Sequence, residues 1–165
     1  MRTRLVVVSF GLLAVLVLFT VTAMGADMLA GTWKLNVAKS KYSPGPAPQS
    51  NMIKFEAIDG GIKLVANGVD FQGKKTHNEY TAKYDGKDSP AKPMLDGKPN
   101  PNAADTVSYR KIDDYTYEAT TKLKGKTLTV ARHVISKDGK SRTVTTTGTN
   151  AQGQKVNDVT MFEKQ

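Results

Sequence analysis

Apolar and polar residues alternate with a period of two along most of the chain after residue 30. In the segment 31–37, Trp33, Leu35 and Val37 fall on one face, and the residues between them are polar. This alternation is typical of strands with one buried face. It recurs in the segments 53–57, 62–66, 79–84, 107–113, 115–123, 128–134, 142–146 and 159–162, separated by turns such as Asp59-Gly60-Gly61. The pattern predicts about nine strands.

The fold class follows from these strands and from the turns between them. No window after residue 30 has a sustained helical period, and Thr, Val and Tyr are abundant. Sequential hairpins predict an all-β fold, a single antiparallel up-and-down β-barrel of about 8–10 strands, because closing the sheet removes its free edges. An open sandwich is the alternative. Two proline-rich segments, 38–50 and 87–104, are expected to be loops, either flaps over a barrel mouth or plain connections.

Residues 1–25 have the pattern of a signal peptide. Arg2 and Arg4 precede an apolar run from Leu5 to Val21, and small residues follow around Gly25. Cleavage after Gly25 or Ala26 would leave one domain, 26–165, in the periplasm or outside the cell. The alternative is an uncleaved anchor helix, although the run is shorter than the ~20 residues that span a bilayer.

Composition narrows the possible chemistry. The full chain has a net charge of +9, which falls to +7 if Arg2 and Arg4 leave with the signal peptide, and it has no cysteine. Disulfides, thiolate metal sites, a cysteine nucleophile and a cysteine-linked lipid anchor are therefore excluded. A basic chain attracts anionic partners, such as an envelope polymer, a membrane surface or a carboxylate ligand. The alternative is a solvated surface with scattered lysines.

Candidate catalytic and metal-binding residues are few. His77 and His133 are the two histidines, so a three-histidine zinc site is excluded, and we expect no metal, no cofactor and no catalytic residue. The alternation of Leu128, Val130 and Val134 predicts that Arg132 faces inward and His133 outward. Because a buried guanidinium is costly unless paired, Arg132 is expected to meet an aromatic ring, an acidic group or an anionic ligand.

Aromatic residues on the inward phases suggest a ligand pocket. Each tyrosine combines an apolar ring with a polar tip, which suits an amphipathic ligand. The alternative is an ordinary core whose tyrosines reach water at the barrel ends. The predicted ligand-binding residues are Phe55, Tyr80, Tyr84, Tyr109, Tyr117 and Arg132.

Gly31-Thr32-Trp33-Lys34-Leu35 resembles the G-x-W motif on the first strand of lipocalins and fatty-acid-binding proteins, together called calycins. The segment 160–164 resembles the closing strand of the latter group. This resemblance implies that Gly31 and Trp33 close the barrel together with a late-strand arginine, Arg132 or Arg142, stacked on the Trp33 ring. The chain also resembles uncharacterised exported bacterial proteins that open with GTWKLN, which implies no activity.

Departures from the calycin pattern restrict what the resemblance implies. Fatty-acid-binding proteins hold the ligand carboxylate with Arg-x-Tyr on the final strand, where this chain has Thr160-Met161-Phe162. Their two-helix lid has no counterpart, because the segment 38–50 is short and rich in proline. The resemblance therefore implies a fold and ligand binding, without specific binding residues.

The leading hypothesis is an exported, monomeric protein that binds a small hydrophobic or amphipathic ligand. The first alternative is a structural or interaction protein of the cell envelope, with a packed barrel and a basic surface. An internal cavity below ~300 Å³ would favour it. A lipocalin-like enzyme is the third hypothesis, and it needs an inward polar pair with shifted pKa values. Nucleic-acid binding is not expected, because the chain is predicted to be exported.

Overall fold

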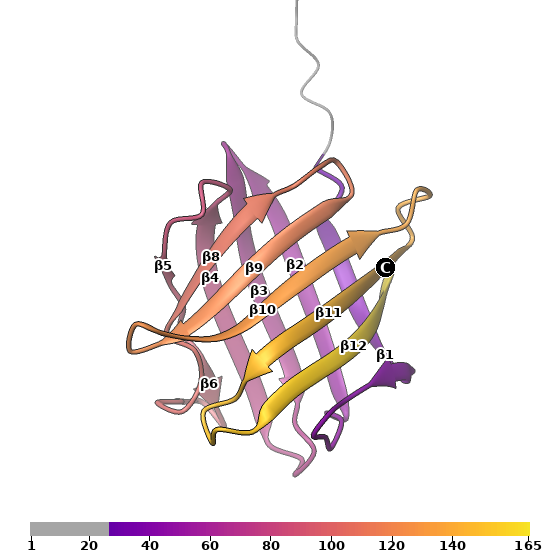
Figure 1. Cartoon of the computed structure of the whole chain (residues 1–165). Helices are drawn as coiled ribbons and strands as arrows, with labels where there is room; N and C mark the ends of the chain where they lie inside the picture. Colours follow the sequence, from indigo (N-terminus) through magenta and orange to yellow (C-terminus); the bar gives the residue numbers. More distant parts are fainter. Residues whose placement is uncertain (1–26) are drawn as a thin grey trace, which may run out of the picture.

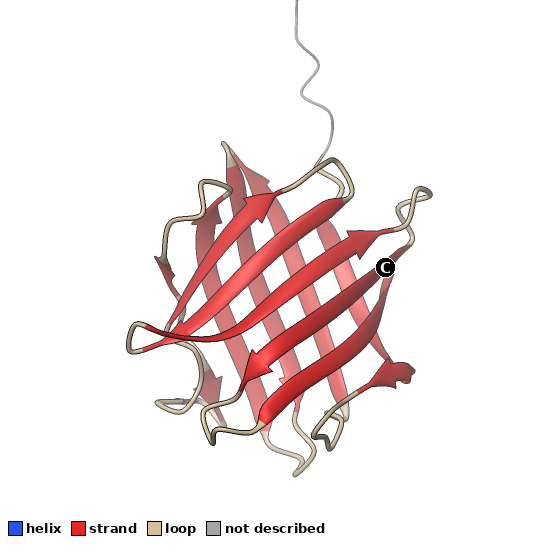
Figure 2. Cartoon of the chain, viewed as in Figure 1, coloured by secondary structure: helices blue, strands red, loops and turns tan. Residues whose placement is uncertain are grey.

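The computed structural model describes residues 27–165, and in this part of the chain all regular structure is β. The predicted signal peptide, 1–25, lies outside the described residues. Figure 2 shows strands and loops alone along the described chain. From residue 27 onward, no helix is long and apolar enough to span a membrane.

Twelve strands form one antiparallel sheet. Their bounds are β1 Gly31–Lys41, β2 Ser50–Ile58, β3 Gly61–Val69, β4 Lys75–Lys83, β5 Ser89–Pro90, β6 Met94–Leu95, β7 Lys98–Pro99, β8 Thr106–Lys111, β9 Thr116–Leu123, β10 Lys126–Ile135, β11 Ser141–Thr149 and β12 Lys155–Lys164. Nine of the twelve have six residues or more, and the other three have two each.

The strands follow an up-and-down order. Going round the sheet, β8, β9, β10, β11 and β12 are neighbours in turn, and β12 then pairs with β1, which leads on to β2, β3 and β4. Figure 1 shows the resulting curl, in which β1–β4 lie behind β8–β12 with the strands of the two groups crossing. The predicted all-β class and antiparallel up-and-down order are therefore confirmed.

The hydrogen-bonded sheet does not close into a complete barrel. Between β4 and β8 there is one isolated bridge, Asp85 to Arg110, beside a hydrogen bond from the Gly86 N–H to the Tyr109 carbonyl of 3.0 Å. The predicted closed barrel is thus observed as a curled sheet in which β4 and β8 are close but do not form a ladder.

The segment 85–105, which we call the strap, covers this seam. Its β5 pairs with β8, and its β6 pairs with β4. The Lys92 N–H donates to the Glu79 carbonyl of β4 at 3.1 Å, and the Ala91 N–H donates to the Asp105 carbonyl at 2.8 Å. The strap therefore satisfies backbone groups on both edges, which would otherwise be exposed. The segment 87–104, predicted as a loop, lies within the strap and contains the two-residue strands β5, β6 and β7.

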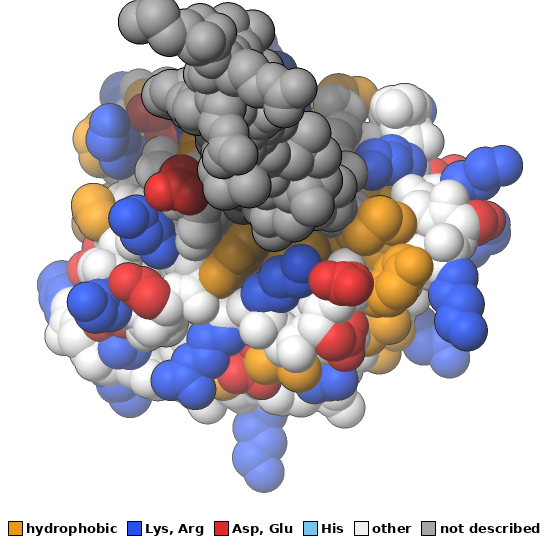
Figure 3. All heavy atoms as spheres, turned by 90° about the horizontal axis from the view of Figure 1, so that it is seen from above, with side chains coloured by type: hydrophobic (Ala, Val, Ile, Leu, Met, Phe, Trp, Pro, Cys, Tyr) orange, Lys and Arg blue, Asp and Glu red, His pale blue; other side chains and the backbone are white. Residues whose placement is uncertain are grey.

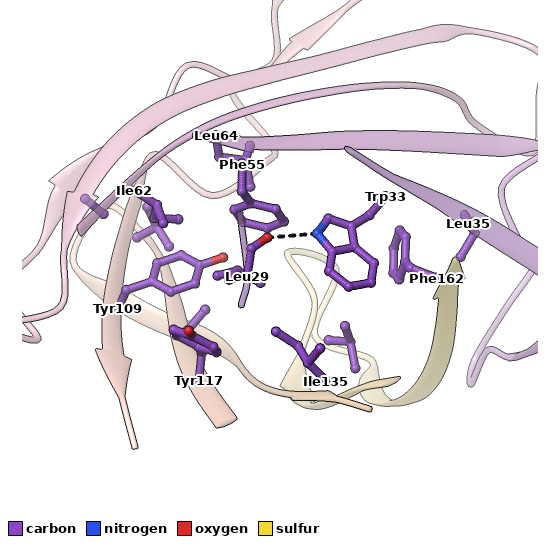
Figure 4. Packing of buried hydrophobic residues seen from close by; sticks show 14 residues of the cluster. Leu29, Trp33, Leu35, Phe55, Ile62, Leu64, Tyr109, Tyr117, Ile135 and Phe162 are labelled. Carbon is purple, nitrogen blue, oxygen red and sulfur yellow. Dashed lines mark hydrogen bonds between the residues drawn. The ribbon is translucent and has the colours of Figure 1, made fainter. Parts of the chain in front are cut away.

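A turn over Asp27–Ala30 closes one end of the curl, which we call the base and which is uppermost in Figure 1. Leu29 is fully buried there, and the Trp33 Nε1–H donates to the Leu29 carbonyl at 2.8 Å, as Figure 4 shows. The hydroxyls of Tyr84 and Tyr117 both donate to the Asp27 carboxylate. The start of the described chain is thus anchored inside the fold.

The opposite end, the mouth, consists of the segment 42–49 and the turns at 70–74, 124–125 and 150–154. The segment 42–49 is hydrogen-bonded on both sides. The Asn157 N–H donates to the Ser43 carbonyl at 2.8 Å, and the Gln49 N–H donates to the Val69 carbonyl at 2.9 Å. The segment therefore connects β12 to β3 across the mouth.

The backbone conformation at the start of β1 requires a glycine. Gly31 has a φ of +128°, which is strained for any residue with a Cβ. A Cβ there would also lie 2.4 Å from the Lys164 Cε, although this flexible side chain can move aside. Lys164 pairs with Trp33 in the β1–β12 ladder, and its Nζ lies 5.0 Å from the centre of the Trp33 ring.

Removing the Asp27 carboxylate should weaken the base. We expect Asp27→Ala to lower the free energy of unfolding by about 1–3 kcal/mol, because Tyr84 and Tyr117 lose their acceptor. Urea denaturation of the purified protein measures this change. Asp59→Ala is the control, since Asp59 is exposed in the β2–β3 turn, and it should change stability by less than about 0.5 kcal/mol. Equal effects of the two substitutions would contradict this account of the base.

Candidate functional site in the lumen of the curled sheet

A cavity of about 340 Å³ lies inside the curl. Phe55, Tyr80, Tyr109, His133 and Arg142 contribute to its wall. Toward the mouth the wall includes small or polar side chains of β9 and β10, namely Ala119, Thr121, Thr129 and Ala131. At the mouth itself, Tyr42 and Pro48 of the segment 42–49 complete the wall.

Arg142 on β11 is fully buried in the wall of this cavity. Its guanidinium carbon lies 5.2 Å from the ring centre of Trp33, 4.9 Å from that of Phe55 and 4.3 Å from that of Phe162. Aromatic faces attract a cation, most strongly where water is excluded. Burial lowers the pKa of Arg142 to about 10, so the guanidinium is still charged at neutral pH.

The polar groups of Arg142 are only partly satisfied. Nη1 lies 3.4 Å from the Nδ1 of His133, whereas Nε and Nη2 are buried without a hydrogen-bond partner in the described structure. None of the ion pairs among residues 27–165 includes Arg142. A buried cation normally has a carboxylate beside it, because an uncompensated charge is costly. Arg142 has aromatic rings and a histidine instead.

His133 on β10 is the second buried polar group of the cavity wall, with 7% of its surface exposed. Because arginine can only donate, the His133 Nδ1 is the acceptor, and its proton therefore lies on Nε2. Burial, and then the charge of Arg142, hold the pKa of His133 well below its ordinary value. The imidazole is thus neutral at neutral pH.

Two tyrosines complete the inner part of the cavity wall. The hydroxyls of Tyr80 on β4 and Tyr109 on β8 lie 3.0 Å apart, so one donates to the other. Burial raises the pKa of both phenols, which are therefore neutral. Each hydroxyl has one proton, and one of the two protons forms the hydrogen bond within the pair. The other proton is free to be donated to a third group.

The electrostatic character of the two ends differs. Seen from the base, basic and acidic side chains are interspersed on the visible face, as Figure 3 shows. At the mouth, lysines outnumber aspartates. The strand ends and turns there carry Lys41, Lys74, Lys75, Lys98, Lys124, Lys126 and Lys155, against Asp70, Asp96, Asp105 and Asp158. This end therefore attracts anions.

The predicted inward position of Arg132 is wrong. Arg132 is exposed and His133 is buried, the reverse of the prediction. The physical reason is the pairing of β10 with β11, in which His133 lies opposite the buried Val144 and Arg132 opposite the exposed Thr145. Residues opposite each other in an antiparallel pair share a face, so β11 sets the phase of β10. Arg132 therefore does not line the cavity, and Arg142 is the arginine that lies over the Trp33 ring.

The other predicted ligand residues divide into two groups. Phe55, Tyr80 and Tyr109 come together in the cavity wall. Tyr84 and Tyr117 lie at the base, where they bind Asp27, and they are not among the residues that line the cavity. Arg142 also lines the cavity, whereas the sequence predicts only a role in barrel closure for it.

A larger hollow, about 550 Å³, lies against the strap. Its wall includes Pro93, Met94, Pro99 and Leu123. The wall is mostly apolar, and its buried unpartnered polar atom in the described structure is the Oδ1 of Asp105. The cavity inside the curl brings several buried polar groups together, as is typical of a specific site. The cavity inside the curl is therefore the candidate site, although it is smaller. No group of three His, Asp or Glu residues within 27–165 could hold a metal ion.

Comparison of the chain with models of known protein families, and with curated protein sequences, finds no match.

The depressed pKa of His133 predicts a pH dependence of stability. In the unfolded chain a histidine binds a proton near pH 6.5, whereas the folded state resists protonation of His133. The free energy of unfolding should therefore fall as the pH drops below about 6.5, with a slope of up to ~1.4 kcal/mol per pH unit from this residue.

Chemical denaturation between pH 5 and 7 measures this slope. His133→Gln should remove this contribution, because the glutamine does not titrate. His77→Gln is the control, since His77 is hydrogen-bonded to Asn67 outside the cavity, and it should keep the wild-type profile. An unchanged slope in His133→Gln would show that His133 does not carry the effect.

Proposed function

We propose that this chain is an exported, calycin-like protein that binds a small amphipathic molecule in the lumen of its curled sheet. The observation that carries the proposal is the cavity of about 340 Å³, whose wall combines aromatic rings with buried polar groups. Ligand sites are typically concave, mostly apolar and supplied with a few converging polar groups. The cavity at Arg142 has each of these properties.

The positions of small side chains support this proposal. On β9 and β10, Ala119 pairs with Ala131 and Thr121 with Thr129, and all four line the cavity. The two threonine hydroxyls are hydrogen-bonded to each other at 2.7 Å. A packed core would place bulky aliphatic residues at such positions, because protein interiors are normally close-packed.

The alternative is an envelope protein with a packed interior that acts through its basic surface. The cavity exceeds the ~300 Å³ at the lower end of ligand pockets, which favours the binding proposal. An enzymatic role has less support, because the groups with shifted pKa values in the cavity wall are an arginine, a neutral histidine and three tyrosines. The carboxylate that affects one of them, Asp158 near Tyr42, is at the mouth and not beside the inner polar groups.

Filling the cavity should abolish binding. We expect wild-type protein purified from its own cell envelope to carry a small molecule in native mass spectrometry, and the Ala131→Leu variant to lack it. Leucine at position 131 places three additional carbon atoms in the lumen. The measurement is the mass of the complex before and after organic extraction.

Ala57→Leu is the matched control, because Ala57 is exposed near the base and does not line the cavity. It should retain the adduct, and thermal melting should show that both variants fold. If the wild-type protein carries no adduct and binds an anionic polysaccharide instead, the envelope alternative replaces this proposal.

A further inference from the structure

An aromatic side chain is exposed in one turn of the mouth. Phe71, in the turn 70–74 between β3 and β4, is 53% exposed. The Asp70 carboxylate accepts the backbone N–H of Gln72 at 2.8 Å and that of Lys74 at 2.9 Å. These hydrogen bonds hold a compact turn that presents the Phe71 ring to the solvent.

The lysines around this turn are available to an external anion. Lys74 and Lys75 come shortly after Phe71, and the seven lysines of the mouth are all exposed. The ion pairs formed within residues 27–165 involve none of these seven. The four aspartates of the mouth each accept a backbone N–H group instead. The ammonium groups can therefore approach a negatively charged surface.

The strap adds apolar side chains at the same end of the molecule. The hollow of about 550 Å³ has Pro93 and Met94 of the strap in its wall. Leu123 and Lys124, beside the turn 124–125 of the mouth, belong to the same wall. The mouth thus combines apolar side chains with lysines, which is the composition of protein surfaces that lie in a membrane interface.

The base also exposes apolar side chains, but it lacks this charge. Ile112 at the β8–β9 turn is 50% exposed, and Asp113 and Asp114 follow it directly. Carboxylates at this position repel an anionic surface. The two ends of the described chain therefore differ in charge more than in apolar exposure, and the mouth is the end that complements an anionic surface.

We infer that the mouth docks on a membrane surface that contains anionic phospholipids. The lysines then lie near the head groups, and Phe71 is buried at the boundary between the head groups and the acyl chains. Phe71 favours a membrane over an anionic polysaccharide, because a hydrated polymer has no hydrocarbon layer in which the ring could be buried. The inference goes beyond the proposed function and does not require a ligand in the lumen.

Tryptophan fluorescence during a vesicle titration tests the orientation. Phe71→Trp places a reporter at the proposed contact, and Ile112→Trp places the same reporter at the base. The buried Trp33 contributes the same background to both. With vesicles of phosphatidylglycerol and phosphatidylcholine in equal parts, the emission of Phe71→Trp should move to shorter wavelengths and that of Ile112→Trp should not. Binding to pure phosphatidylcholine should be at least about tenfold weaker, because the attraction of the lysines is lost.

Cosedimentation with the anionic vesicles measures the contribution of the lysines. The double variant Lys74→Gln, Lys75→Gln should bind at least about tenfold more weakly, because each lysine near an anionic surface strengthens binding about fivefold. The matched control is Lys137→Gln, Lys140→Gln, which removes the same charge from the β10–β11 turn at the base. It should change the affinity by less than about twofold, because salt screens charges that lie far from the membrane.

A second pair of variants measures the contribution of the aromatic ring. Phe71→Ala should weaken cosedimentation about tenfold, because the ring no longer leaves water. Ile112→Ala is the control, since it removes an apolar side chain of similar exposure from the base, and it should bind as the wild-type protein does. All these side chains are exposed, so the variants should melt at the wild-type temperature.

Three results would overturn the inference. The first is that the wild-type protein does not bind the anionic vesicles. The second is an equal shift of both reporters, which would show that the mouth is not the docking end. The third is unchanged binding of Phe71→Ala together with displacement of the wild-type protein by dextran sulfate, which would indicate a site for soluble polyanions. None of these results concerns the lumen, because the native mass spectra described above decide on its ligand separately.

Discussion

The fold depends on a buried arginine that is surrounded by aromatic rings. Arg142 of β11 touches Trp33 of β1, Phe55 of β2 and Phe162 of β12, so one side chain connects four strands around the junction between the first and last strands. A desolvated cation–π contact contributes up to about 2 kcal/mol, whereas burying an ion costs several kcal/mol. The rings therefore offset much of this cost without providing the hydrogen bonds that a guanidinium needs.

The base, the strap and the mouth together determine where the lumen is accessible. The Asp27–Ala30 turn closes the base through Leu29, Trp33 and the two tyrosines that bind Asp27. The strap covers the seam between β4 and β8. The mouth, with its lysines, is the end at which the cavity reaches the segment 42–49. The proposed ligand would enter there.

Much of the fold could be predicted from the sequence, because most strands bury a face that is clearly more apolar than the other. Trp33 and Leu35 on β1, and Ile62 and Leu64 on β3, are buried as their alternation predicts. β10 is the exception. Its inner face carries Thr129, Ala131 and His133, whereas Val134 on its outer face is 43% exposed. On β10 the pattern of apolar and polar residues therefore predicts the wrong face as the buried one.

The exception coincides with the wall of the cavity. Thr129, Ala131 and His133 line it, and an inner face made of small and polar side chains cannot be recognised by hydrophobicity alone. A one-residue irregularity at Leu128, between the β9 pairings of Thr127 and Thr129, further disturbs the alternation. Gly148 permits it, because a Cβ there would lie 2.2 Å from the Leu128 carbonyl oxygen. Neither the pairing partner of β10 nor this close approach can be read from one segment of sequence.

The cavity itself gives a further reason to assign a function to the lumen. Larger side chains at Ala119 or Ala131 would bury more apolar surface and would stabilise the fold. The space is open at the mouth, and polar groups such as Arg142 and His133 in its wall favour hydration. A chain that keeps the space open and lines its inner end with donors has the composition expected of a binding site, and not that of a core optimised for stability.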